Sequence, residues 1–305
     1  MKTKKIALLI AAPVLVVGFF YAIRDCIESR AAIGSNWYPV NAMLPGNIQL
    51  QNVVWADKQF VTVGDAGAIL TSRDGLTWTR QYSGTTHRLE DIVWSGNQFV
   101  VVGRAGEILT SPNGMTWTSQ NSGTTAKLKG VTWSGSQFVV VGEHGVILTS
   151  PNGTTWISRT SGTTDSLYDA VWSGREFVIV GWNGTILTSL DGVKWMARNS
   201  GTGNPVLAIA WSGKRFVAVG GNGSILTSPD GVAWYFRHSG TSRWLFGVTW
   251  SSKQFIADGD YSTILTSTDG ESWTSHSPAM EASLQGVACS GQQCVAVGSS
   301  IFRSY

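Results

Sequence analysis

Residues 131–142 read VTWSGSQFVVVG, and close copies of this block recur along the chain of 305 residues. The tryptophan of the block returns every 39 residues, at Trp55, Trp94, Trp133, Trp172, Trp211 and Trp250. The next step of 39 residues reaches Cys289. A fixed period of this length indicates a repeat architecture, in which each unit buries its faces against its neighbours.

Each unit contains four short segments, which we name a, b, c and d. In the third unit they read LKGVTWS, QFVVVG, VILTS and TWISR. The segments are rich in Val, Ile, Thr, Trp and Phe and are separated by Gly, Asn, Asp and Ser, which is typical of strands and turns and shows no helical period. Four strands in about 40 residues predict one blade of a β-propeller.

The two ends of the chain complete the predicted ring. The seventh unit has strands LQGVAC, CVAVG and IFRSY, after which the sequence ends one strand short of a blade. Near the other end, residues 35–38 (SNWY) resemble the d segments that contain Trp78 and its equivalents. We therefore predict an all-β fold over residues 31–305, a seven-bladed propeller whose N-terminal strand closes the last blade.

Cys289 and Cys294 replace the Trp and the Phe of the repeated block. The a-to-b turn has two central residues, usually with Gly first, so the Trp and Phe positions face each other across a hairpin. Such a pair brings its side chains close together. We expect a Cys289–Cys294 disulfide, because the separation suits the required geometry; the alternative is a pair of buried thiols.

Residues 1–30 have a different composition from the repeats. Lys2, Lys4 and Lys5 precede an uncharged apolar run at residues 6–23 that is long enough to reach nearly across a bilayer. We expect a retained, single-pass signal anchor and a short linker, with a cleaved signal peptide as the alternative. The lysines place the N-terminus in the cytoplasm and the propeller on the periplasmic or lumenal side.

The c-to-d turns share the pattern of SPNGMTW at residues 111–117. They resemble the Asp-box (BNR) hairpins of sialidases and of the photosystem II assembly and stability factor family, which are also seven-bladed propellers, although the spacing from acid to Trp is one residue shorter here. Asp and Asn exchange at this position, so we expect an acceptor that caps the turn rather than a catalytic group. These residues are Asp74, Asn113, Asn152, Asp191, Asp230 and Asp269.

Catalysis is not expected from the sequence. The Arg-Ile-Pro segment of sialidases is absent, the four histidines lack zinc spacing, and there is neither a GxSxG motif nor a phosphate loop. We expect no cofactor and no metal. Without residues 1–30 the chain has seventeen bases and seventeen acids, and a neutral exported domain is a poor partner for nucleic acid.

Two sets of loops differ from unit to unit, the b-to-c turns and the d-to-a crossovers, and both should lie on one face of the ring, the top. The alternative is that these loops vary because nothing constrains them. Exposed aromatic and basic residues there are typical interface anchors. The predicted partner-binding residues are Trp182, Trp244, Tyr261 and Arg243, with a basic sector of Arg88, Arg104, Lys127 and His144.

Two functions fit this face. The first, which the photosystem family resemblance implies, is a scaffold, assembly factor or accessory subunit that binds a membrane protein complex. Those relatives carry an arginine-rich docking patch, matched here loosely by Arg88 and Arg104. The second is a glycan-binding or glycan-cleaving propeller, which would need carboxylates converging on the channel mouth, such as Glu90, Glu143 and Asp260.

Overall fold

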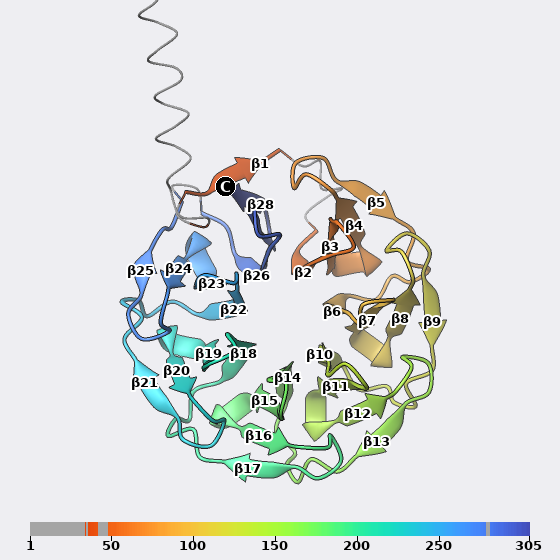
Figure 1. The fold of residues 1–305 in the computed structure, drawn as a ribbon. Coiled ribbons are helices and arrows are strands. Elements are labelled where there is room, and N and C mark those ends of the chain that lie inside the picture. The colour runs from red at the N-terminus through yellow and green to blue at the C-terminus, as the bar shows by residue number, and fades with distance from the viewer. Residues whose placement is uncertain (1–33, 35, 42–47, 279–280) are drawn as a thin grey trace, which may run out of the picture. The chain divides into compact units, whose positions relative to one another are not determined.

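The computed structural model describes residues 34, 36–41, 48–278 and 281–305. These residues form seven four-stranded antiparallel sheets arranged as a ring (Figure 1). The predicted seven-bladed propeller is therefore confirmed. The predicted membrane anchor at residues 6–23 lies outside the described residues, and no helix within the described part is long and apolar enough to span a membrane.

Strand a is innermost in every blade and strand d is outermost. The a strands are β2 (Leu50–Ala56), β6 (Leu89–Trp94), β10 (Leu128–Trp133), β14 (Leu167–Trp172), β18 (Val206–Trp211), β22 (Leu245–Trp250) and β26 (Leu284–Cys289). The b strands are β3 (Gln59–Gly64), β7 (Phe99–Gly103), β11 (Phe138–Gly142), β15 (Phe177–Gly181), β19 (Phe216–Gly220), β23 (Phe255–Gly259) and β27 (Cys294–Gly298).

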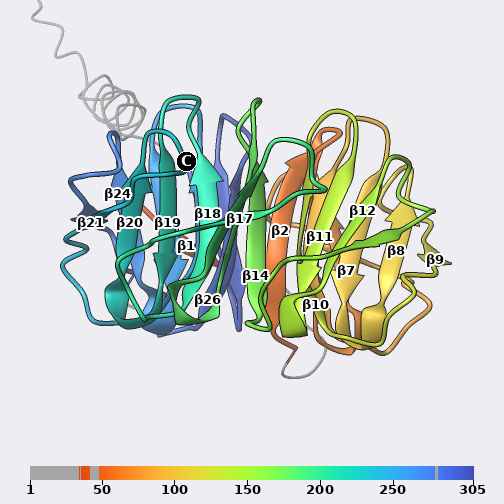
Figure 2. The same cartoon turned by 90° about the horizontal axis from the view of Figure 1, so that it is seen from below.

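The c strands are β4 (Ile69–Ser72), β8 (Ile108–Ser111), β12 (Ile147–Ser150), β16 (Ile186–Ser189), β20 (Ile225–Ser228), β24 (Ile264–Ser267) and β28 (Ile301–Ser304). The d strands are β5 (Thr79–Gln81), β9 (Thr118–Gln120), β13 (Ile157–Arg159), β17 (Met196–Arg198), β21 (Tyr235–Arg237), β25 (Thr274–Ser275) and β1 (Tyr38–Val40). Blades 1 to 7 start at β2, β6, β10, β14, β18, β22 and β26. In side view the inner strands stand upright, whereas β17 lies almost across them (Figure 2).

Short 3₁₀ turns connect strands b and c in the first six blades. They are η1 (Asp65–Gly67), η2 (Arg104–Gly106), η3 (Glu143–Gly145), η4 (Trp182–Gly184), η5 (Gly221–Gly223) and η6 (Asp260–Ser262). The middle residue of each turn adopts a left-handed conformation, as His144 does with a φ of 58°. Non-glycine residues rarely adopt this conformation, so each turn carries some backbone strain.

The predicted hairpin register is confirmed. Trp133 pairs with Phe138, and their ring centroids are 4.2 Å apart. In the seventh blade Cys289 pairs with Cys294 in the same register. There the two sulfur atoms are joined in a disulfide, with the Cα atoms 4.0 Å apart.

The hydrophobic core is divided among the interfaces between neighbouring blades. At the first interface, Val61 and Ile69 of blade 1 pack with Leu89 and Phe99 of blade 2, and all four are fully buried. Burial of one such side chain contributes roughly 1.5–3 kcal/mol. Each blade is therefore stabilised by packing against both of its neighbours.

The c-to-d turns are built as the acceptor exchange predicts. The Asp74 carboxylate accepts hydrogen bonds from the backbone N–H groups of Leu76 and Thr77, at 2.9 and 2.8 Å. Asn113 accepts the equivalent pair through its side-chain oxygen, from Met115 and Thr116. These bonds, that from Thr77 foremost, lower the pKa of Asp74 to about 2. Either acid or amide therefore closes the turn.

The N-terminal strand completes blade 7 by rebuilding a c-to-d turn from two chain ends. The Gly34 N–H donates to Ser304 Oγ at 2.9 Å, and Trp37 Nε1 donates to Gly34 O at 2.8 Å. Gly75 and Trp78 make the equivalent hydrogen bonds in blade 1. The closure predicted from residues 35–38 is confirmed, since β1 pairs with β28.

Candidate partner-binding face

The two variable loop sets lie together on one face of the ring. The Arg104 N–H on η2 donates to the carbonyl of Arg88, which ends the crossover into β6, at 2.9 Å. The Asp260 N–H makes the equivalent bond to Trp244 O at 3.0 Å. On the opposite, bottom face, Gln59 beside an a-to-b turn donates to Asn113 O of the next c-to-d turn. The top face is thus formed by the η turns and crossovers.

The aromatic residues of the top face occupy neighbouring blades. The Arg243 guanidinium lies over the Tyr261 ring, 4.7 Å from its centroid, and donates to the Tyr261 carbonyl. Trp244 packs beside Phe246 with ring centroids 6.3 Å apart, and it also covers Gly221 of η5. Trp182 is exposed on η4 of blade 4, the blade before the one that carries η5. The structure therefore joins Arg243 to Tyr261 and directs Trp244 toward the channel.

Three basic residues of the top face gather around Glu90, and one of them, Arg88, also lies 3.4 Å from Asp65. Glu90 Oε1 lies 3.2 Å from Arg88 Nε, 3.6 Å from Arg104 Nε and 3.1 Å from Lys127 Nζ. The Glu90 side chain is only 10% exposed. Burial strengthens the attraction of Glu90 to Arg88 and Lys127, whereas Arg104 is 54% exposed and its pair is screened by water. Three of the four predicted basic residues therefore converge, but Glu90 partly neutralises them, while His144 is exposed on η3.

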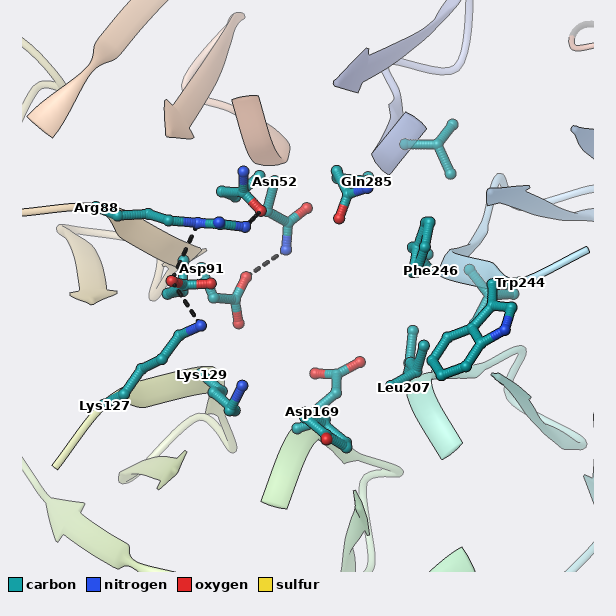
Figure 3. Close-up of a pocket in the computed structure, with 18 residues that line it drawn as sticks. Asn52, Arg88, Asp91, Lys127, Lys129, Asp169, Leu207, Trp244, Phe246 and Gln285 are labelled. Carbon is teal, nitrogen blue, oxygen red and sulfur yellow. Dashed lines mark hydrogen bonds and ion pairs between the residues drawn. The ribbon is translucent and has the colours of Figure 1, made fainter. Parts of the chain in front are cut away.

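A cavity of about 280 Å³ lies in the ring centre and is lined by the a strands. Its walls differ in chemistry. Figure 3 shows Arg88, Lys127 and Lys129 on one side, and Leu207, Trp244 and Phe246 on the other. Burial and the charge of Lys127 lower the pKa of Lys129 to about 8. The arrangement suits a ligand with one anionic part and one apolar part.

Sequence reasoning missed most of this lining, although a signal for it exists. The second residue of strand a recurs at the 39-residue interval and changes chemistry in almost every blade. These residues are Gln51, Glu90, Lys129, Tyr168, Leu207, Phe246 and Gln285. A position that varies within an otherwise regular strand indicates that its side chain does not belong to the repeated core.

Two buried acids beside the cavity connect blades. Asp91 accepts hydrogen bonds from the N–H groups of Ile92 and of Val131 in the next blade, both at 2.7 Å. Asp169 bonds in the same way to Ala170 and to Ile209 of the next blade. Burial raises their pKa values, to about 6 for Asp91 and about 7 for Asp169. Their oxygens are occupied by backbone donors, which favours a structural role.

The carboxylates expected of a glycan-cleaving site do not form an acid pair. Glu90 is bound to three cations, Glu143 lies 3.7 Å from Lys129, and Asp260 accepts from Ser283 Oγ. Of these three acids, Glu90 alone lines the cavity. Across the described ranges, no group of three or more His, Cys, Asp or Glu side chains could hold a metal ion.

The fold defines a seven-bladed β-propeller whose c-to-d turns are capped by Asp or Asn. No protein-family model matches the chain, and no curated protein matches it. Many solved structures are similar in fold, and two of them are structures of YCF48. YCF48 from Cyanidioschyzon merolae has a TM-score of 0.71 and 18% identity, covering 88% of this chain and 98% of that one. A structure of YCF48 bound to D1 peptide has a TM-score of 0.72 and 15% identity, covering 90% and 95%. The resemblance to this photosystem II assembly factor is confirmed for the fold.

Proposed function

We propose that the protein is a noncatalytic, membrane-anchored propeller that binds an extramembrane segment of a membrane protein complex on its top face. It would act as a scaffold, assembly factor or accessory subunit. The observation that carries the proposal is the contrast between a nearly invariant repeat and top-face loops that differ in every blade. The similarity to YCF48 bound to D1 peptide supports a polypeptide partner.

The cavity indicates which part of a partner the top face receives. A peptide could place an acidic group against Arg88 and Lys127 and an apolar side chain against Trp244 and Phe246. Exposed Trp182, on η4 of blade 4, extends the aromatic surface beyond the cavity. Large aromatic and guanidinium groups of this kind carry most of the binding energy in protein interfaces.

We propose that an anchor at residues 6–23 tethers the propeller to a membrane. The disulfide of blade 7 is consistent with a periplasmic or lumenal location, with the N-terminus in the cytoplasm.

The test is affinity capture of the tagged full-length protein from native membranes in mild detergent, with partners identified by mass spectrometry. The top-face variant is Trp182→Ala/Trp244→Ala/Arg104→Ala. The matched control changes exposed bottom-face residues, as Leu76→Ala/Met115→Ala. The proposal requires a defined membrane complex that is captured by wild type and control and lost by the folded top-face variant. A complex retained by that variant would refute the assignment of the face.

A further inference from the structure

The outer wall of the ring changes chemistry over three consecutive blades. The first residue of strand d is Thr79, Thr118 and Thr274 in blades 1, 2 and 6. In blades 3 to 5 it is Ile157, Met196 and Tyr235, which are 48%, 59% and 52% exposed. Blade 7 has Tyr38, which is 53% exposed, at this position, and the same strand accepts threonine in blades 1, 2 and 6. The fold therefore does not require apolar side chains at this exposed position.

The third position of strand d changes over the same three blades. Gln81 and Gln120 donate from Nε2 to a threonine of strand c at 2.9 Å. Arg159, Arg198 and Arg237 make the equivalent bond from Nε, at 2.9, 2.9 and 3.0 Å. A neutral amide is enough for this contact, so the charge of the guanidinium and its two terminal nitrogens are additional to what the fold needs.

The grooves at the rim show the same difference. Between blades 4 and 5 a groove of about 550 Å³ is lined by Leu190, Met196, Arg198 and Val232 among others. The corresponding groove of blades 1 and 2, of about 410 Å³, is lined by polar residues that include Thr79 and Gln81, with Met115 as its one apolar lining residue. Leu190 is 67% exposed, and Phe236, beside Tyr235, is 54% exposed.

We propose that the outer wall of blades 3 to 5 binds an extended, acidic segment of another protein that carries spaced apolar side chains. We define this wall by Ile157, Met196, Tyr235 and Phe236 with Arg159, Arg198 and Arg237. The apolar residues would receive the apolar side chains, and the guanidinium groups would pair with the carboxylates. This site is separate from the top face and goes beyond the proposed function.

The surrounding charges favour an acidic partner. On the bottom-face turns of blades 3 to 6, five acids balance five bases: Glu176, Asp191, Asp230, Asp269 and Glu271 against Arg175, Lys194, Lys214, Arg215 and Lys253. Glu271 contacts both Arg215 and Arg237. Because Arg237 is already paired with Glu271, Arg159 and Arg198 carry the excess positive charge of this wall, and no acid lies on β13, β17 or β21.

The shape of the wall favours an extended segment. Strands β13, β17 and β21 follow the circumference of the ring one after another (Figure 1). Their outer edges are not paired within the blades, and an extended peptide can add to such an edge. The wall spans three adjacent blades of a seven-bladed ring, so its outer surface is convex. A flat bilayer touches a convex wall at a single place, so it cannot contact all three blades together.

Two other occupants fit the charges poorly. A second copy of this chain that presented the same wall would bring like-charged arginines together. Residues 1–33 of the chain carry five bases and two acids, so they lack the complementary charge. The partner that fits is therefore a different, acidic chain.

The test uses phage-displayed random peptides as the probe, selected on the full-length protein and counter-selected on Ile157→Thr/Met196→Thr/Tyr235→Thr. These substitutions copy the residue of blades 1, 2 and 6, so the variant should fold normally. We expect acidic peptides with spaced apolar residues. Synthetic copies should lose about tenfold or more in affinity for the threonine variant and for Arg159→Gln/Arg198→Gln, the size of effect that interface anchors produce.

Binding should be unchanged in the Thr79→Ser/Thr118→Ser control and in the top-face variant Trp182→Ala/Trp244→Ala. Loss of peptide binding in the top-face variant would assign the peptides to the top face and overturn the wall proposal without affecting the proposed function. The wall proposal also fails if no selected peptide depends on the wall, or if the dependent peptides lack acidic residues. Cosedimentation of the protein with anionic lipid vesicles that the threonine variant abolishes would assign the wall to a membrane and refute the proposal.

Discussion

Asp258 is a buried acid in a position that is valine in the other six blades, at Val63 and its equivalents. It is fully buried on β23 between blades 6 and 7, and neither side-chain oxygen has a hydrogen-bond partner among the described residues. The space it fills lies against Gly247, where an added Cβ would collide with Asp258 Oδ1. Burial raises the pKa of Asp258 to about 8. We predict that Asp258→Val stabilises the protein.

The size of the effect depends on pH. Because the folded pKa is raised, the native state holds a proton that the unfolded state releases above about pH 4. Protonation of Asp258 makes its full contribution to the free energy of unfolding below the pKa of the unfolded state. This contribution falls by about 1.4 kcal/mol per pH unit as the pH rises toward 8. The advantage of Asp258→Val should therefore grow by about 3 kcal/mol between pH 5 and pH 7.

Thermal unfolding of wild type, Asp258→Val and Asp258→Asn at both pH values measures this difference. At about 2 °C per kcal/mol for a domain of this size, the gap in Tm between wild type and Asp258→Val should widen by about 6 °C from pH 5 to pH 7. Asn cannot titrate, so the gap between the two variants should stay constant. A gap between wild type and Asp258→Val that does not change with pH would refute a neutral, buried Asp258.

Three further predictions concern the closure, the turns and the channel. Cys289→Ser/Cys294→Ser should lower the free energy of unfolding by about 2 kcal/mol in denaturant titrations, the value for a short closed loop, and Cys289→Trp/Cys294→Phe should recover part of it. Asp74→Ala should cost about 1 kcal/mol because two backbone donors lose their acceptor, whereas Asp74→Asn should match wild type at neutral pH. Since the pKa of Asp74 is lowered to about 2, its charge contributes stability above about pH 4 that is lost as the pH falls toward 2, and the Asn variant should lack this loss. Glu90→Gln removes the acid shared by three cations, of which Arg88 keeps Asp65 and Arg104 is half exposed, and should lower stability by about 1 kcal/mol, with Tm then rising on addition of salt.

The ring and its register could be predicted because they depend on local repetition. The 39-residue interval places Trp133 opposite Phe138, and the same register places Cys289 opposite Cys294. Residues 35–38 could be assigned to the last blade because Trp37 repeats the pattern around Trp78. In each case a short segment carries its own turn chemistry, and neighbouring copies show what the segment becomes.

The chemistry of the channel could not be predicted in the same way. Glu90 looked like a possible catalytic acid, but its partners Arg88, Arg104 and Lys127 come from crossovers and a turn of two blades. Such a contact depends on how side chains from different units meet, which no single unit encodes. Asp258 was overlooked for a related reason, since the apolar sequence of strand b shows only that the position is buried.

Site-specific photo-cross-linking tests the central claim, that the top face binds a membrane protein complex, most directly. A photoreactive amino acid would replace Trp182 or Trp244 on the top face, or Met115 on the bottom face, in the full-length protein in native membranes. The account predicts that both top-face positions cross-link to the same membrane protein and that position 115 does not. Cross-links to that protein from position 115, with none from the top face, would contradict it.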